Sequence, residues 1–143
     1  MTLKAILKGK PPGFISVLPT ASIREVIAVL AGKRIGAVLV VDAAGKLAGI
    51  LSERDIVRSL ASAAADTLDM TAIQLMTAHP VTATPATTVS EAMAIMTEGH
   101  FRHLPILEAG RLTGLVSIGD VVKARIDQSQ HEVESLRTYV VGG

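Results

Sequence analysis

The sequence contains an internal duplication, which limits the fold to an arrangement of two similar units. A segment that begins at Pro19 reappears 66 positions later, from Pro85. After the loss of one residue in a turn, the segment from Gly45 to Asp55 reappears 65 positions later and ends at Asp120. At about 150 residues per domain, a chain of 143 residues leaves little room beyond the two copies. A multidomain enzyme does not fit this length.

Each copy predicts the order strand, helix, strand, strand, helix. In the first copy, apolar residues follow the spacing of a helix face from Ile23 to Leu30, and Ser22 is the predicted N-cap. The apolar run 37–41 is short and β-branched, which favours a buried strand. The predicted strands are 17–18, 37–41 and 47–51 in the first copy and 81–82, 103–107 and 112–116 in the second.

One such copy cannot cover the apolar face of its own three-stranded sheet. We therefore expect an α+β fold in which tandem repeats pack about a pseudo-twofold axis and form two related clefts. The predicted division is an N-terminal segment 1–16, a first repeat 17–66, a linker 67–80, a second repeat 81–126 and a C-terminal helix 127–143.

The C-terminal helix carries apolar residues at the alternating spacing of a helix–helix seam, interrupted by one serine. The positions are Val122, Ile126, Ser129, Val133, Leu136 and Val140. Because the pattern is shorter than three or four heptads, packing on the helix's own domain is the favoured interpretation. A dimer seam is the alternative.

Composition excludes several classes of function. Lys and Arg number 14 against 13 Asp and Glu, and aromatic residues make up 2%, which argues against a nucleic-acid surface. Cysteine is absent, so disulfides, thiolate metal sites and cysteine nucleophiles are excluded, and the scattered histidines predict no metal site. Apolar runs fall short of the roughly 18 residues of a membrane span. We expect a cytoplasmic protein without nucleic-acid or membrane partners.

The pattern Gly-apolar-apolar-Ser-x-x-Asp closes both copies, at 49–55 and 114–120. A serine at a helix start places a hydroxyl beside free backbone amides, which suits a phosphate. An aspartate three residues later offers acceptors for the two hydroxyls of a ribose, and the glycine lets a flat group approach the strand. The same Ser-x-x-Asp spacing is also that of a plain helix cap, and this alternative stays open.

Basic residues accompany these motifs. Arg54 lies within the first, while Arg102 and His103 precede a strand of the second copy and could reach a phosphate. A solvated edge is the alternative interpretation of the pair.

The duplicated motif, together with the run 101–106 (Phe-Arg-His-Leu-Pro-Ile), resembles the cystathionine-β-synthase (CBS) domain pair, or Bateman module, over residues 16–125. The resemblance implies a non-catalytic module without a catalytic cofactor. Its clefts would bind an adenosine-containing ligand such as AMP, ADP, ATP or NAD(H), and a homodimer would signal to an effector protein.

The resemblance also implies two sites, each built from both copies. The first combines Ser52, Arg54 and Asp55 with Thr82, Arg102 and His103, and the second combines Ser117 and Asp120 with Ser16, Val17, Gly36 and Ala37. Because Gly36 and Ala37 replace the basic pair, we expect unequal affinities. With few aromatic side chains, aliphatic residues would hold the adenine, namely Val17, Val38, Leu104 and Ile106.

Three functions remain in competition at this point. The leading hypothesis is a nucleotide sensor, and the alternative is a structural or adaptor dimerisation module with no nucleotide ligand. An enzyme acting on nucleotides is disfavoured, since no general base is visibly paired with a nucleophile. The residues do not indicate which adenine nucleotide binds, whether both clefts fill, or which protein responds.

Overall fold

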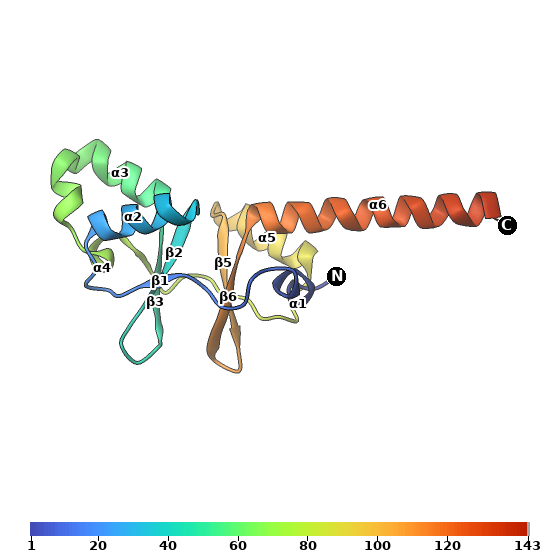
Figure 1. Cartoon of the computed structure of the whole chain (residues 1–143), viewed down its shortest axis with the longest axis horizontal. Helices are drawn as coiled ribbons and strands as arrows, with labels where there is room; N and C mark the ends of the chain where they lie inside the picture. Colours follow the sequence, from blue (N-terminus) through green and yellow to red (C-terminus); the bar gives the residue numbers. More distant parts are fainter. Residues whose placement is uncertain (143) are drawn as a thin grey trace. The chain divides into compact units, whose positions relative to one another are not determined.

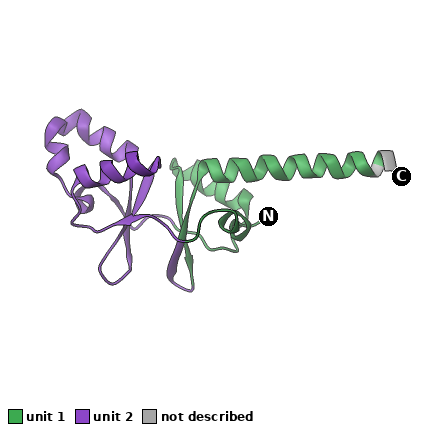
Figure 2. Cartoon of the chain, viewed as in Figure 1, with its two compact units in different colours: residues 1–12, 82–108, 114–143 green, residues 13–81, 109–113 purple. Residues whose placement is uncertain are grey.

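The computed structural model describes residues 1–142, which form two compact units (Figure 2). The first-repeat unit consists of residues 13–81 and the short segment 109–113. The second-repeat unit consists of residues 1–12, 82–108 and the chain from 114 onward. Each unit therefore holds one copy of the duplication, and the N-terminal residues belong with the second copy.

The first-repeat unit contains a four-stranded sheet in the order β1-β2-β3-β4, with β1 parallel to β2 and the other pairs antiparallel. Figure 1 labels β1, β2 and β3 of this sheet. Its strands are β1 (Ser16–Val17), β2 (Ala37–Val41), β3 (Leu47–Ser52) and β4 (Thr77–Ala78). Its helices are α2 (Ile23–Lys33), α3 (Glu53–Ala63), the 3-10 helix η1 (Ala64–Asp69) and α4 (Ala72–Leu75). The predicted strands 37–41 and 47–51 and the helix that begins at Ile23 are confirmed.

Burial explains why these segments form a sheet and a helix. All five residues of β2 are buried, and Val38 lies opposite Leu51 of β3. Helix α2 begins where Ser22 Oγ accepts a hydrogen bond from the Glu25 amide at 3.2 Å. It buries Val26 and neighbouring apolar residues against the strands. Val38 and Val40 of β2 thus meet the periodic apolar residues of α2 in one core.

The second-repeat unit repeats this pattern with a smaller sheet. Its elements are α1 (Leu3–Lys8), α5 (Val89–Gly99), β5 (His103–Glu108), β6 (Arg111–Ser117) and α6 (Ile118–Gly142), except that the start of β6 falls in the segment 109–113 assigned to the first-repeat unit. Thr88 caps α5 by accepting from the Glu91 amide at 3.0 Å, as Ser22 caps α2. The core includes Leu104, Ile106 and Val116, and Leu3 of α1 joins it with no exposed surface.

The opening strand predicted at 81–82 is wrong. Only an isolated parallel bridge between Ala83 and Ile106 forms there. In the first-repeat unit the amide of Leu39 donates to the Ile15 carbonyl at 3.2 Å. The equivalent residue of the second copy is Pro105, which has no amide hydrogen, so one rung of the ladder cannot form. Strand β4 lies in the predicted linker and was not expected.

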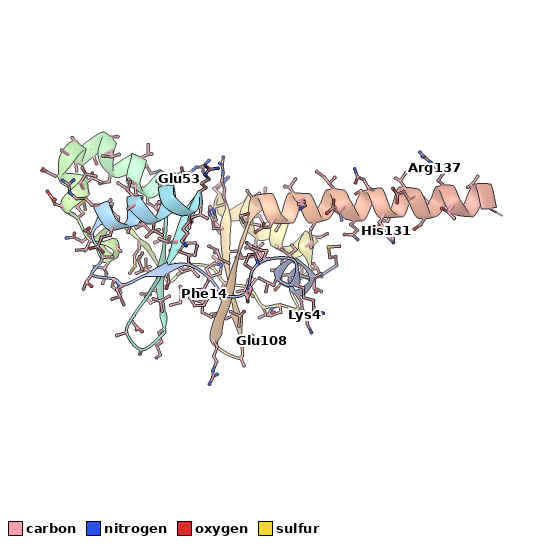
Figure 3. The ribbon with its side chains drawn as sticks, in the orientation of Figure 1. Lys4, Phe14, Glu53, Glu108, His131 and Arg137 are labelled. Atoms are coloured by element: carbon pink, nitrogen blue, oxygen red, sulfur yellow. The ribbon has the colours of Figure 1, made fainter. Side chains whose placement is uncertain are left out.

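Helix α6 is one continuous element that includes the predicted C-terminal helix as far as the described residues extend; residue 143 lies outside them. Its side chains project from the helix along its length, as those of His131 and Arg137 show (Figure 3). Val133, Leu136 and Val140 are 54%, 64% and 76% exposed. The favoured interpretation, in which this helix packs on its own domain, is therefore wrong for the apolar positions from Val133 to Val140.

Two short arms complete the units in the same way. In the first-repeat unit, the Ile23 amide donates to the Met70 carbonyl at 2.8 Å, and Ser22 bridges Thr71. In the second-repeat unit, Val89 donates to the Met1 carbonyl at 3.0 Å, and Thr2 bridges Thr88. We call residues 1–10 the N-terminal arm and residues 70–79 the linker arm. Each arm adds an extended edge and a short helix to one repeat.

The sequence predicted no apolar run long enough to span a membrane. Among residues 1–142, no helix has the length and apolar composition needed to cross a membrane.

Candidate functional site

The residues predicted to bind a ligand lie at strand ends and helix starts. The first-repeat unit contains Ser16, Val17, Gly36, Ala37, Ser52, Arg54 and Asp55, and the second-repeat unit contains Thr82, Arg102, His103, Ser117 and Asp120. Within the first-repeat unit, Ala37 is paired with Ser52 across β2 and β3. The grouping of residues across the two copies stays a prediction.

The first junction is the segment 52–55, where β3 ends and α3 begins; Glu53 marks it in Figure 3. Asp55 Oδ2 accepts hydrogen bonds from the Ser52 amide at 2.8 Å and from Ser52 Oγ at 3.0 Å. The Asp55 amide donates in return to Ser52 Oγ at 3.4 Å. These contacts make a complete capping box.

The second junction is the segment 117–120, where β6 ends and α6 begins. Asp120 Oδ2 accepts from the Ser117 amide at 2.9 Å, and the Asp120 amide donates to Ser117 Oγ at 3.1 Å. Asp120 Oδ2 also accepts a hydrogen bond from Lys10 Nζ at 2.7 Å. No equivalent contact is described for Asp55 in the first junction. Lys10 Nζ also donates to the Leu115 carbonyl at 2.9 Å.

The local alternative of a plain helix cap is therefore confirmed at both junctions. The cap leaves part of each carboxylate available, because every described hydrogen bond that the Asp55 and Asp120 carboxylates accept ends on Oδ2. A carboxylate has two oxygens and about four acceptor positions. One aspartate can thus cap its helix through Oδ2 and accept a ligand hydroxyl through Oδ1.

Fewer backbone amides are available for an anion at each helix start than the sequence predicted. The Glu53 amide donates to the Gly36 carbonyl at 2.9 Å, and the Ile118 amide donates to the Arg102 carbonyl at 2.8 Å. The third helical amide of each helix donates to the capping serine. Among the hydrogen bonds described for residues 1–142, none uses the amides of Arg54 and Gly119. One amide per junction, that of Arg54 or Gly119, therefore remains outside the described hydrogen bonds for an anion.

The electrostatic state of Asp120 reflects Lys10. Burial alone raises the pKa of the Asp120 carboxyl. The hydrogen bond from Lys10, the hydrogen bonds from Ser117 and the charge of the ammonium outweigh burial and leave this pKa below its usual value. Asp120 is therefore held as a carboxylate paired with a cation.

The motif glycines have a different role from the one predicted. A Cβ built on Gly49 would lie 2.6 Å from Met76 Sδ and 2.6 Å from the Thr77 carbonyl oxygen. A Cβ built on Gly114 would lie 2.8 Å from Leu7 Cδ2. The close approach that requires glycine is made by the linker arm and the N-terminal arm, not by a flat ligand. That prediction is corrected at both positions.

The aliphatic residues expected around an adenine are mostly unavailable. Val38, Leu104 and Ile106 have no exposed surface and belong to the two cores. Val17 is partly exposed at the end of β1. The expectation is wrong for the three core residues, because their contacts are already made within the fold.

Sequence reasoning missed Lys10, which lies 110 positions from Asp120. A signal for it was present in the sequence. Both arms begin with Met-Thr, at 1–2 and 70–71, and both reach a proline, Pro11 and Pro80, after the same number of residues. Aligning the arms places Lys10 opposite His79 and would have identified 1–10 as part of the repeat.

The fold and motif agree with comparisons to known proteins. A family model described as the CBS domain matches residues 11–62 and 72–127. The solved CBS-domain containing protein ATU1752 from Agrobacterium tumefaciens is 42% identical, with a TM-score of 0.85, over 87% of this chain and 99% of that one. CBSX3, a mitochondrial CBS domain-containing protein of Arabidopsis thaliana, is 36% identical over 99 residues, 68% of this chain. The chain spans about half of that relative, 48% of its length.

Two further solved relatives carry adenosine compounds. A CBS domain protein from Pyrobaculum aerophilum, solved with AMP, is 28% identical with a TM-score of 0.74, over 84% of this chain and 89% of that one. The CBS domain pair of protein MJ0100, solved with 5′-methylthioadenosine and S-adenosyl-L-methionine, is 27% identical with a TM-score of 0.78, over 90% and 98%. On the matched family model and the two repeats described above, the chain belongs to the CBS domain family and carries a pair of CBS domains.

Proposed function

We propose that the chain is a non-catalytic regulatory module that binds adenosine-containing ligands through its two junctions. Candidate ligands are AMP, ADP, ATP and NAD(H), and the bound state is read by an effector protein. The observation that carries the proposal is the duplicated junction, in which an aspartate caps a helix through one oxygen and the second oxygen lies outside the described hydrogen bonds.

The chemistry of the junctions supports a nucleoside more strongly than a free phosphate. Each helix start has one amide outside the described hydrogen bonds, whereas each carboxylate has one whole oxygen outside them. Carboxylate oxygens accept from the hydroxyls of a ribose, and they repel an anion. We propose that Asp55 and Asp120 hold the ribose, with Ser52 and Ser117 beside them, and that basic residues such as Arg54, Arg102 and His103 serve the phosphate.

The ligands of related proteins support the same class. AMP, 5′-methylthioadenosine and S-adenosyl-L-methionine, found in two relatives, share an adenosine group and differ in what is attached to it. A site that recognises the ribose and leaves the 5′ group variable would accept all three.

We also propose that the chain acts as a homodimer in the cytoplasm. The exposed apolar positions of α6, from Val133 to Val140, would form the seam. The same seam supports the second candidate, an adaptor module without a nucleotide. Deletion of 127–143 separates the two functions. Loss of the dimer with nucleotide binding retained supports the sensor, and loss of the dimer in a chain that binds no nucleotide supports the adaptor.

Calorimetric titration with adenosine, AMP, ATP and NADH tests ligand binding and gives its stoichiometry. At a ligand concentration a hundredfold above Kd, linkage predicts about 2.7 kcal/mol of added stability and a higher Tm. If all four compounds leave both the heat signal and the Tm unchanged, the chain is not an adenosine sensor.

Paired variants identify the residues that bind. We expect Asp55→Asn and Asp120→Asn each to weaken binding at one site, because a neutral amide accepts hydroxyl hydrogen bonds less strongly than a carboxylate. Ser22→Ala is the matched control, since it removes a helix cap of the same kind outside the junctions and costs about 1 kcal/mol of stability. If Asn variants and control lower stability alike and leave affinity unchanged, the two aspartates are caps only.

A further inference from the structure

Lys10 joins the N-terminal arm to the second junction through two hydrogen bonds. Its ammonium reaches Asp120 Oδ2 at 2.7 Å and the Leu115 carbonyl at 2.9 Å. An ammonium donates up to three hydrogen bonds and accepts none, so two of its donors are used by these two acceptors. The side chains of Lys10 and Asp120 are 36% and 27% exposed. The pair is therefore partly covered and still open to solvent.

The contact engages the group that the proposed ligand needs. Asp120 Oδ2 already accepts from the Ser117 amide, and Lys10 is the second donor on the same oxygen. A ribose diol placed on this carboxylate meets a cation that lies against both the acid and the main chain of β6. Either the ammonium leaves, or the ligand is restricted to the remaining oxygen.

The first junction lacks this contact. Alignment of the two arms places His79 where the N-terminal arm has Lys10. Among the ion pairs described for residues 1–142, none involves Asp55. The two junctions thus share a motif and a helix cap, and the contact with a lysine is described for the second junction alone.

We propose that Lys10 is a displaceable occupant of the second junction: a ligand whose two ribose hydroxyls bind both oxygens of Asp120 must remove the Lys10 ammonium from Oδ2. The inference rests on the proposed function and adds a regulatory step to it. Because a partly exposed ion pair is weak, its displacement lowers ligand affinity by only about two- to fivefold. Ligand binding at this junction therefore releases the end of the N-terminal arm from its anchor.

The test isolates the second junction with Asp55→Asn and compares that chain with the double variant Asp55→Asn/Lys10→Met. Calorimetry with adenosine and with AMP is expected to show affinities about two- to fivefold higher when Lys10 is replaced. Lys8→Met in the same background is the matched control, since Lys8 is an exposed lysine of the same arm. The control is expected to leave both affinities unchanged.

Other outcomes overturn the inference. Unchanged affinities after replacement of Lys10 would make the contact purely structural. Weaker AMP binding with unchanged adenosine binding would make Lys10 a ligand of the phosphate instead of a competitor. Lys10→Gln, which keeps N–H donors without the charge, is the second variant if the methionine variant does not fold.

The failure of the inference is distinguishable from that of the proposed function. If the wild-type chain binds AMP, but neither the Asp55→Asn chain nor the double variant does, the second junction is not a site: the inference is wrong, and the proposed function holds for the first junction alone. If the wild-type chain and the Lys10→Met single variant both bind no adenosine compound, the proposed function is wrong as well. Binding that appears only after replacement of Lys10 supports both.

Discussion

The first and second junctions have the same motif and the same capping hydrogen bonds, yet their carboxylates lie in different surroundings. Asp55 is engaged by its own serine alone among the contacts described, whereas Asp120 also holds Lys10 at 2.7 Å. The difference comes from the arms, whose first residues make matching backbone hydrogen bonds but whose ends differ, since α1 continues to Lys8 whereas α4 ends at Leu75 and is followed by β4. Duplication thus preserved the framework of each site, and the segment packed beside it made the sites unequal.

The arms also differ in how strongly they are anchored. The N-terminal arm inserts Leu3 into its core, whereas the linker arm inserts the smaller Ala72 at the equivalent position, and both are fully buried. The two motif glycines also face different atoms of the arms. A Cβ on Gly49 would meet the Thr77 backbone carbonyl oxygen, whereas a Cβ on Gly114 would meet the end of the flexible Leu7 side chain.

The largest expected effect comes from removing the anchor of the N-terminal arm. Leu3→Ala should lower the free energy of unfolding by about 2–5 kcal/mol, because it leaves a cavity in the second-repeat core. Urea denaturation measures the change. The exposed neighbour Lys4 provides the control, since Lys4→Ala should change stability by less than about 0.5 kcal/mol. Equal effects of the two substitutions would show that the arm is not anchored by Leu3.

A smaller effect separates the two glycines. Gly49→Ala should destabilise the chain by about 1–3 kcal/mol, because the new methyl meets the Thr77 carbonyl oxygen, which cannot move without its strand. Gly114→Ala should cost less than about 1 kcal/mol, because the Leu7 side chain can rotate away. Thermal denaturation of the two variants gives the order directly. The comparison fails if Gly114→Ala is the more damaging substitution.

The smallest expected effect concerns the ion pair and its dependence on pH. The pKa of Asp120 is lower in the folded chain than its usual value. The stability that it contributes is therefore complete above the unfolded pKa, about 3.9, and is lost as the pH falls through the folded pKa. Lys10→Met should lower stability by about 0.2–1 kcal/mol at pH 7, and the difference from the wild-type chain should shrink below about pH 3.9.

Urea denaturation of wild type and variant at pH 7 and pH 3 checks this prediction. A difference that is the same at both pH values would show that Lys10 stabilises the chain through packing of its alkyl stem and not through its charge.

Much of the fold could be predicted from the sequence, because the duplication showed each element twice. The spacing of apolar residues from Ile23 to Leu30 and the continuous apolar run 37–41 identified a helix and a strand that the structure confirms. The second opening strand could not be predicted by analogy, because a proline at position 105 removes a single amide hydrogen from the ladder.

The candidate site was only partly predictable. The positions of Ser52, Asp55, Ser117 and Asp120 at helix starts followed from their spacing, and so did the capping alternative. The role of Lys10 did not, because its contact with Asp120 depends on the packing of a distant arm. Apolar residues near the motif were assigned to an adenine, although a buried valine or leucine has the same pattern whether it faces a ligand or a core.

The origin of the N-terminal arm has a consequence for folding during synthesis. Residues 1–10 are made before the repeat that they complete, and the carboxylate that binds Lys10 is made 110 residues after it. The linker arm, in contrast, is made shortly after the repeat that it completes. Because domains tend to fold as they emerge, the first-repeat unit can close while the N-terminal arm still waits for its partner. Until residue 120 has been made, Leu3 and Lys10 of the N-terminal arm are without the core and the carboxylate that they contact in the folded chain, and this is the stage at which chaperone binding would matter most.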